Sequence, residues 1–132
     1  MRIYGNPMDT KLTILLIEDD PDQIFLYQSK FELEGFGMLS ARYGSEGLKL
    51  AREQKPDIIL LDLVLIAENG LDVLASMKKD PLVKNIPVMI LTNLERDDAK
   101  TKAKELGAVD FLTKANMMPS DVVRRIREIL KK

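Results

Sequence analysis

Five short apolar runs alternate with five segments of helical pattern along the chain, and this alternation constrains the fold more than any other feature. The runs cover residues 12–17, 38–41, 58–61, 87–91 and 109–113. Short runs that are apolar almost throughout are typical of strands buried on both faces. Strands that alternate with helices form βα units. The pattern therefore predicts an α/β fold with a five-stranded parallel sheet covered by helices on both sides.

The helices between these runs have recognisable starts. Asp20 followed by Pro21 predicts an N-cap and a first helical residue, and Ser45 is predicted to be the N-cap of the next helix. The predicted helices cover residues 21–34, 46–54, a segment opened by Gly70, residues 96–106 and a segment opened by Pro119. Right-handed crossovers and the positions of the acidic residues favour a doubly wound, flavodoxin-like sheet with strand order 2-1-3-4-5.

The length and the charge balance of the chain limit the number of domains and the kinds of partner that we expect. We expect one domain over residues 11–132, preceded by a loose extension over residues 1–10 that contains Gly5, Asn6 and Pro7. No apolar run is long enough to cross a bilayer, so we expect no membrane contact and a cytoplasmic protein. Lys and Arg number 20 against 21 Asp and Glu. This balance argues against direct contact with nucleic acid.

Two absent residue types narrow the chemistry further. The chain has no cysteine, which excludes disulfides and thiolate nucleophiles, and no histidine, which excludes imidazole metal sites and histidine general bases. A bound metal must then be a hard cation with oxygen ligands, and Mg²⁺ is the first candidate.

Polar side chains stand at the ends of four of the five apolar runs. Glu18 and Asp19 follow the first run, Asp62 the third, Thr92 the fourth and Lys114 the fifth. Any one of these could simply cap a helix or begin a loop. Because open α/β sheets bind ligands at the carboxyl ends of their strands, their coincidence at successive ends indicates a functional site.

The residue types at these ends suit phosphoryl transfer. Glu18, Asp19 and Asp62 would oppose one another's ionisation unless a cation lies among them, which favours a Mg²⁺ site. Asp20 is better explained as the helix cap. Asp62 is then predicted to accept a phosphoryl group, with Lys114 and the Thr92 hydroxyl contacting its oxygens.

With these motifs, the sequence from about residue 11 to residue 130 resembles the receiver domains of response regulators in two-component signalling. The resemblance implies that Asp62 is the phosphoacceptor, that Glu18 and Asp19 are the acidic pair, and that Val64 offers its backbone carbonyl to the metal. It also implies that Thr92 and Phe111 form the switch and that a histidine kinase or phosphotransfer protein is the phosphodonor. The output would be a downstream protein or a second copy, bound through the face of the fourth helix, fifth strand and fifth helix. That face carries Arg96, Lys100, Lys104, Asp110, Arg124 and Arg125.

The sequence departs from the family pattern near the site. Ile66 and Ala115 stand where such domains usually carry proline, whereas Gly70 matches. Val64 and Leu94 are apolar at positions that often hold polar side chains able to orient the hydrolytic water. We therefore expect slow self-dephosphorylation.

Two alternatives stay open from the sequence. A receiver-like interaction module that is never phosphorylated would explain the missing prolines. An aspartate-based phosphohydrolase would use Asp20 and Asp22 as a D-x-D pair, but it needs a further acidic pair that is missing. We expect a switch with weak self-phosphorylation and self-dephosphorylation, not an enzyme.

Overall fold

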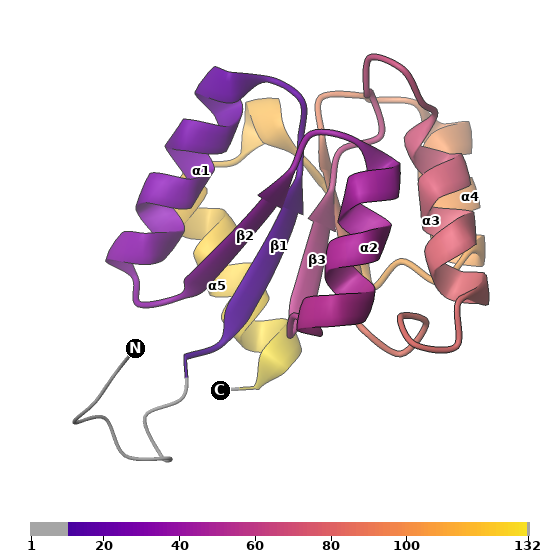
Figure 1. The fold of residues 1–132 in the computed structure, drawn as a ribbon. Coiled ribbons are helices and arrows are strands. Elements are labelled where there is room, and N and C mark those ends of the chain that lie inside the picture. Colours follow the sequence, from indigo (N-terminus) through magenta and orange to yellow (C-terminus); the bar gives the residue numbers. More distant parts are fainter. Residues whose placement is uncertain (1–10, 132) are drawn as a thin grey trace.

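A parallel sheet of five strands forms the centre of the computed structural model, which describes residues 11–131 (Figure 1). The strands are β1 (Thr13–Ile17), β2 (Gly37–Ala41), β3 (Ile58–Leu61), β4 (Val88–Thr92) and β5 (Asp110–Thr113). Their order is β2-β1-β3-β4-β5 and every neighbouring pair is parallel, so the predicted fold is confirmed. The extension expected over residues 1–10 lies outside the described residues.

Helices cover both faces of this sheet. They are α1 (Pro21–Leu33), α2 (Gly44–Gln54), α3 (Gly70–Lys79), α4 (Asp97–Glu105) and α5 (Pro119–Leu130), with a short 3-10 helix, η2 (Lys114–Asn116), after β5. Figure 1 shows α1 and α5 on one side of the sheet and α2, α3 and α4 on the other. None of these helices is long and apolar enough to cross a membrane.

The strands divide the core into two halves because successive side chains point to opposite faces. Leu15, Ile59 and Ile90 belong to the half that packs against α2, α3 and α4. Leu16 and Leu60 belong to the half that packs against α1 and α5. β1, β3 and β4 are therefore buried on both faces, which explains why their sequences are apolar almost without a break.

The predicted cap of the second helix was wrong. α2 begins at Gly44, so Ser45 lies inside its first turn, and the residue at the N-cap position, Tyr43, makes no side-chain hydrogen bond to the helix. Asp20, in contrast, accepts a hydrogen bond from the backbone N–H of Asp22 at 2.9 Å and caps α1 as predicted. Local sequence identified the first cap because its acceptor is adjacent in the chain.

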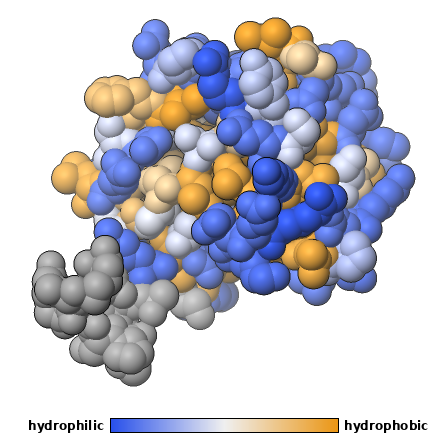
Figure 2. All heavy atoms as spheres, viewed as in Figure 1, coloured by the Kyte–Doolittle hydropathy of each residue, from blue (hydrophilic) through white to orange (hydrophobic). Residues whose placement is uncertain are grey.

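The exposed surface is mainly polar, with separate apolar groups. Figure 2 shows apolar residues over α1 and over the loop that follows β3, surrounded by hydrophilic ones. The exposed large apolar side chains include Phe25 and Leu33 of α1 and Val64 and Ile66 of that loop. The last two lie two and four residues after Asp62 in the sequence.

The turn after α3 is held by a buried carboxylate. Asp80 accepts hydrogen bonds from Nε of Arg52 in α2 at 2.5 Å and from the N–H of Leu82 at 2.9 Å. The hydrogen bond from Arg52 is the main reason that the pKa of Asp80 lies below its usual value of 3.8. A carboxyl group with a lowered pKa stabilises the fold above its unfolded pKa and loses that contribution as the pH falls through its folded pKa.

We therefore predict that Asp80→Asn lowers the free energy of unfolding at pH 7, and that the difference from wild type shrinks as the pH falls below 3.8. Urea denaturation at a series of pH values measures this. Asp72→Asn, at an exposed acid of the preceding helix α3, serves as the control and should follow wild type. A difference between Asp80→Asn and wild type that persists unchanged at low pH would contradict this assignment.

Candidate functional site

The side chains predicted to form a site meet at one edge of the sheet. Glu18 and Asp19 directly follow β1, Asp62 follows β3, Thr92 ends β4 and Lys114 follows β5. β1 pairs with β3, β3 with β4, and β4 with β5. The carboxyl ends of these four strands are thus successive neighbours, about 5 Å apart from strand to strand.

Asp62 lies at the centre of this group. Its side chain is only 7% exposed. One carboxylate oxygen accepts hydrogen bonds from the Thr92 hydroxyl at 2.7 Å and the Val64 N–H at 3.0 Å. The other accepts from the Lys114 ammonium group at 3.0 Å. Three donors from three strand ends therefore hold one carboxylate.

Lys114 also forms an ion pair with Glu18, so one ammonium group lies between two buried carboxylates. Glu18 is 2% exposed, and burial raises its pKa despite the opposing effect of Lys114. For Lys114 burial acts in the opposite sense and lowers the pKa. The hydrogen bond to Glu18 and the charge of Asp62 outweigh it, so the pKa of Lys114 lies above its usual value. Lys114 is therefore protonated at neutral pH.

Asp19 and Asp20 have different surroundings. The Asp19 carboxylate accepts a hydrogen bond from the Ile66 N–H at 2.6 Å, and its backbone carbonyl accepts one from Arg42 at 3.0 Å. Asp20 turns away to cap α1. The D-x-D pair of a phosphohydrolase would need Asp20 as its nucleophile, and this cap takes Asp20 out of that role.

The donor set at this edge suits a hard cation. It consists of the carboxylates of Glu18, Asp19 and Asp62, and the backbone carbonyl of Val64 is a further oxygen from the adjacent loop. A cationic group, the Lys114 ammonium, already contacts two of the carboxylates. As the side chains stand, no three acidic residues within 11–131 converge closely enough to hold a metal ion. Metal binding would require these acids to rearrange around the ion, since the Lys114 ammonium contacts Glu18 and Asp62 and the Asp19 carboxylate accepts from the Ile66 N–H.

The loop between β3 and α3 approaches the site through backbone contacts. The Leu63 carbonyl accepts from the Gly70 N–H at 3.0 Å, and Val64 pairs with Asn69 in an isolated antiparallel bridge. A Cβ atom on Gly70 would lie 2.4 Å from the Leu63 Cα atom and 2.7 Å from the Asp62 carbonyl oxygen. Only glycine therefore fits where α3 begins beside Asp62.

Phe111 lies on the opposite side of β4 from this loop. It is partly buried, and the Lys100 ammonium lies 5.8 Å from the centre of its ring, within range for a cation–π interaction. The residue before it, Asp110, forms an ion pair with Arg125 of α5. The predicted output face thus carries a cation beside the Phe111 ring and, one residue away in β5, an ion pair to α5.

Two contacts of the site were missed from the sequence. Arg42 reaches the backbone of Asp19 from the start of α2, and Tyr27 of α1 is buried close enough to Lys114, Glu18 and Asp62 for their charges to act on its pKa. Burial is the main reason that this pKa is raised. An arginine in the loop before α2 and a tyrosine on α1 carry no sequence signal for these positions, which depend on tertiary packing.

Comparison with known families gives one clear match. The model of the family described as "Response regulator receiver domain" matches residues 14–127. Among curated relatives, the protein PilH of Pseudomonas aeruginosa is 36% identical over 101 residues, which cover 76% of this chain and 84% of PilH.

Other relatives are longer than this chain. The alkaline phosphatase synthesis transcriptional regulatory protein PhoP of Bacillus subtilis is 33% identical over 119 residues, which cover 90% of this chain and 48% of PhoP. The chain thus spans about half the length of this relative.

Solved structures agree with this match. The phosphorylated cyanobacterial phytochrome response regulator RcpA is 29% identical, with a TM-score of 0.79 and coverage of 93% of this chain and 96% of RcpA. The Mn²⁺-bound form of response regulator Rcp1 is 30% identical, with a TM-score of 0.72 and coverage of 89% and 90%.

We predict that Lys114→Met destabilises the fold in the absence of divalent cations, by about 3 kcal/mol, because it leaves two buried carboxylates without their cation. Chemical denaturation in the presence of a chelator measures this. Lys49→Met, on the exposed side of α2, should change stability by less than ~0.5 kcal/mol. A loss below about 1 kcal/mol for Lys114→Met would show that the buried pair matters little to stability.

Proposed function

This chain belongs to the response regulator receiver domain family of two-component signalling, and on that premise we propose that it is a switch operated by phosphorylation of Asp62. The phosphodonor is a phosphohistidine on a kinase or phosphotransfer protein. During transfer the phosphorus–nitrogen bond to the donor imidazole breaks, and a phosphorus–oxygen bond to the Asp62 carboxylate forms. The imidazole leaves with the electron pair and takes up a proton.

One observation supports this proposal above the others: the Asp62 carboxylate is held by a hydroxyl, a backbone N–H and an ammonium group at the same strand-end edge. Phosphoryl transfer depends mainly on positioning and on stabilising charge around the transferred group. Lys114 and Thr92 already contact the acceptor oxygens. They can therefore contact the oxygens of a phosphoryl group attached there. The phosphorylated state of the similar protein RcpA supports the same chemistry.

We propose that Mg²⁺ is the cofactor and that Glu18, Asp19, Asp62 and the Val64 carbonyl hold it. When bound, the cation would neutralise charge on the acceptor carboxylate and on the incoming phosphoryl oxygens. Magnesium prefers oxygen ligands, which are the ligands offered here. The similar protein Rcp1 is Mn²⁺-bound, another divalent cation suited to oxygen ligands.

We propose that Thr92 and Phe111 couple phosphorylation of Asp62 to a conformational change at the face of α4, β5 and α5. The Thr92 hydroxyl donates to Asp62 and accepts from the Leu94 N–H at 3.3 Å, so it connects the site to the loop before α4. If the hydroxyl moves to a phosphoryl oxygen, that loop follows and changes the space beside Phe111. The face of α4, β5 and α5 would then bind a downstream protein or a second copy.

Composition and family membership also bear on nucleic-acid binding, enzymatic activity and location. A net charge of −1 gives no reason for direct nucleic-acid binding. Receiver domains act as switches and not as enzymes, and we propose that this chain acts beside its kinase in the cytoplasm.

We predict that wild type incubated with Mg²⁺ and a small phosphodonor gains one phosphoryl group by intact mass, and that Asp62→Asn does not. The amide oxygen is too weak a nucleophile to replace the carboxylate. Asp20→Asn is the matched control, because it removes a nearby acid that only caps α1, and it should keep the adduct. An adduct that survives in Asp62→Asn would place the acceptor elsewhere.

The residues beside Asp62 bear on the lifetime of the acyl phosphate. Val64 is 57% exposed beside Asp62 and offers no side-chain hydrogen bond to a hydrolytic water. We expect wild type to keep its phosphoryl group for minutes or longer, and Val64→Asn with Leu94→Gln to shorten this lifetime by about tenfold or more. Phosphoprotein decay after donor removal measures it, with Leu82→Asn as an exposed control far from Asp62 in the sequence. A wild-type lifetime of seconds contradicts the prediction.

A further inference from the structure

The tip of the loop after β3, residues 65–68, is held at two points outside the loop. The Ile66 N–H donates to the Asp19 carboxylate at 2.6 Å, and the Glu68 carboxylate accepts from the Gly44 N–H at 2.5 Å. Among the described residues, no other hydrogen bond leaves this tip. Leu65 is buried, while Ile66 is 82% exposed, so apolar packing fixes only part of the segment.

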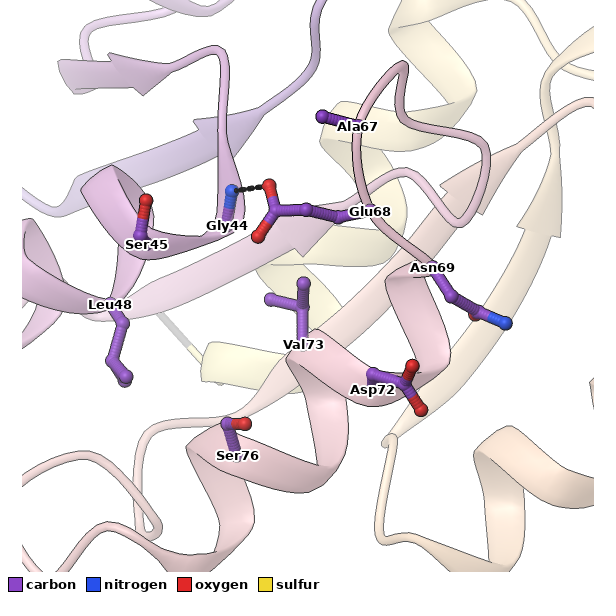
Figure 3. Close-up of a pocket in the computed structure, with 9 residues that line it drawn as sticks. All are labelled: Gly44, Ser45, Leu48, Ala67, Glu68, Asn69, Asp72, Val73 and Ser76. Carbon is purple, nitrogen blue, oxygen red and sulfur yellow. Dashed lines mark hydrogen bonds between the residues drawn. The ribbon is translucent and has the colours of Figure 1, made fainter.

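The Gly44 contact lies at the beginning of α2. The first N–H groups of a helix have no partner within the helix, and a carboxylate there is favoured by the helix dipole. α2 has no side-chain cap from its own N-cap residue, Tyr43. Glu68 therefore caps α2 from 24 residues away in the sequence. Figure 3 shows its carboxylate reaching from the loop to Gly44, across a pocket between α2 and α3.

The glycine at position 44 is what allows this contact. A Cβ atom on Gly44 would lie 2.4 Å from a methyl group of Val73 in α3 and 2.7 Å from the second Glu68 oxygen. The absence of a side chain at Gly44 lets α2 lie against α3 and leaves room for the carboxylate. Glu68 itself is partly buried, unlike its neighbour Ala67.

The two ends of this contact also border the acidic pair. Arg42, two residues before Gly44, donates to the Asp19 carbonyl at 3.0 Å. Ile66, two residues before Glu68, donates to the Asp19 carboxylate. The segment just before α2 and the loop tip thus both donate a hydrogen bond to Asp19. The hydrogen bond between Glu68 and Gly44 connects these two segments directly.

We propose that Glu68 is a positioning residue for the phosphorylation site: by capping α2 it keeps the loop tip closed beside Asp19 and Asp62. The other tether of the loop tip, from the Ile66 N–H, ends on the Asp19 carboxylate, which is itself a proposed metal ligand. If the Asp19 carboxylate turns so that it no longer faces the Ile66 N–H, this tether is lost. The contact between Glu68 and Gly44 then remains to hold the tip, and with it the position of Val64, whose apolar side chain offers no hydrogen bond to a hydrolytic water.

The proposal rests on the proposed function for its effect on phosphorylation, but not for its effect on the loop. Three variants separate the contributions. Glu68→Ala removes the acceptor, Glu68→Gln keeps an acceptor oxygen without the charge, and Asp72→Asn changes a different, exposed acid that lines the same pocket.

The first measurement is amide hydrogen exchange of residues 64–68, followed by NMR without phosphodonor or metal. Glu68→Ala should exchange about fivefold faster there, the fold-change that corresponds to a typical helix cap of ~1 kcal/mol. Exchange in β3, which reports global opening, is the internal reference and should change less. Glu68→Gln should stay close to wild type, and Asp72→Asn should match it. Loop exchange that is unchanged in Glu68→Ala, or equally fast in Glu68→Gln, overturns the proposal.

The second measurement is the decay of the acyl phosphate. Glu68→Ala should shorten its lifetime severalfold, with Glu68→Gln restoring it. Faster loop exchange with an unchanged lifetime would make Glu68 a structural cap only and overturn its positioning role. A wild-type protein that takes up no phosphoryl group would overturn the proposed function, while the exchange data would still decide whether Glu68 holds the loop.

Discussion

The ion pairs of Lys114 with Glu18 and Asp62 are the interaction on which the functional end of this fold depends. Two carboxylates that are almost fully buried lie close to one another, an arrangement that costs free energy unless a cation is present. The ammonium group of Lys114 contacts both. One side chain thus meets a structural requirement of the fold, and it stands where the phosphoryl group proposed for Asp62 would need a positive charge.

This arrangement follows from the parallel sheet and its strand order. The order β2-β1-β3-β4-β5 makes neighbours of strands that are distant in the sequence, so that Glu18 and Lys114, 96 residues apart, form a direct contact. The strands themselves are apolar because both faces are covered by helices. Polar side chains can therefore gather only where the strands end, and the site lies at the carboxyl ends.

The sequence predicted the features that depend on periodicity and on strand ends. The five strands and the common edge of Glu18, Asp62, Thr92 and Lys114 were predicted because apolar runs and the residues that end them are local signals. The strand order was predicted from the rule of right-handed crossovers and the positions of the acidic residues. The contacts that join one element to a distant one were not predicted. The cap of α2 was assigned to Ser45, whereas the acceptor is Glu68 in another loop. Arg42 and Tyr27 were missed for the same reason, because their contacts depend on how helices pack and not on local pattern.

The loops on the two sides of Asp62 differ in how firmly they are held, and this difference bears on the direction of any conformational change. The loop after β3 is tied through Val64 to Asp62, through Ile66 to Asp19 and through Glu68 to α2. The loop after β4 is tied to the site, among the described residues, by a single long hydrogen bond from the Leu94 N–H to the Thr92 hydroxyl.

That hydroxyl is also the group that must respond when the charge on Asp62 changes, because it donates to the carboxylate. A rigid loop on one side and a weakly held loop on the other would direct movement toward α4 and Phe111. The ties of the first loop would then be as necessary to the switch as the weaker attachment of the second. If both loops beside Asp62 could move equally, phosphorylation would favour no single conformational change, and the face of α4, β5 and α5 would not be altered in preference to the other side.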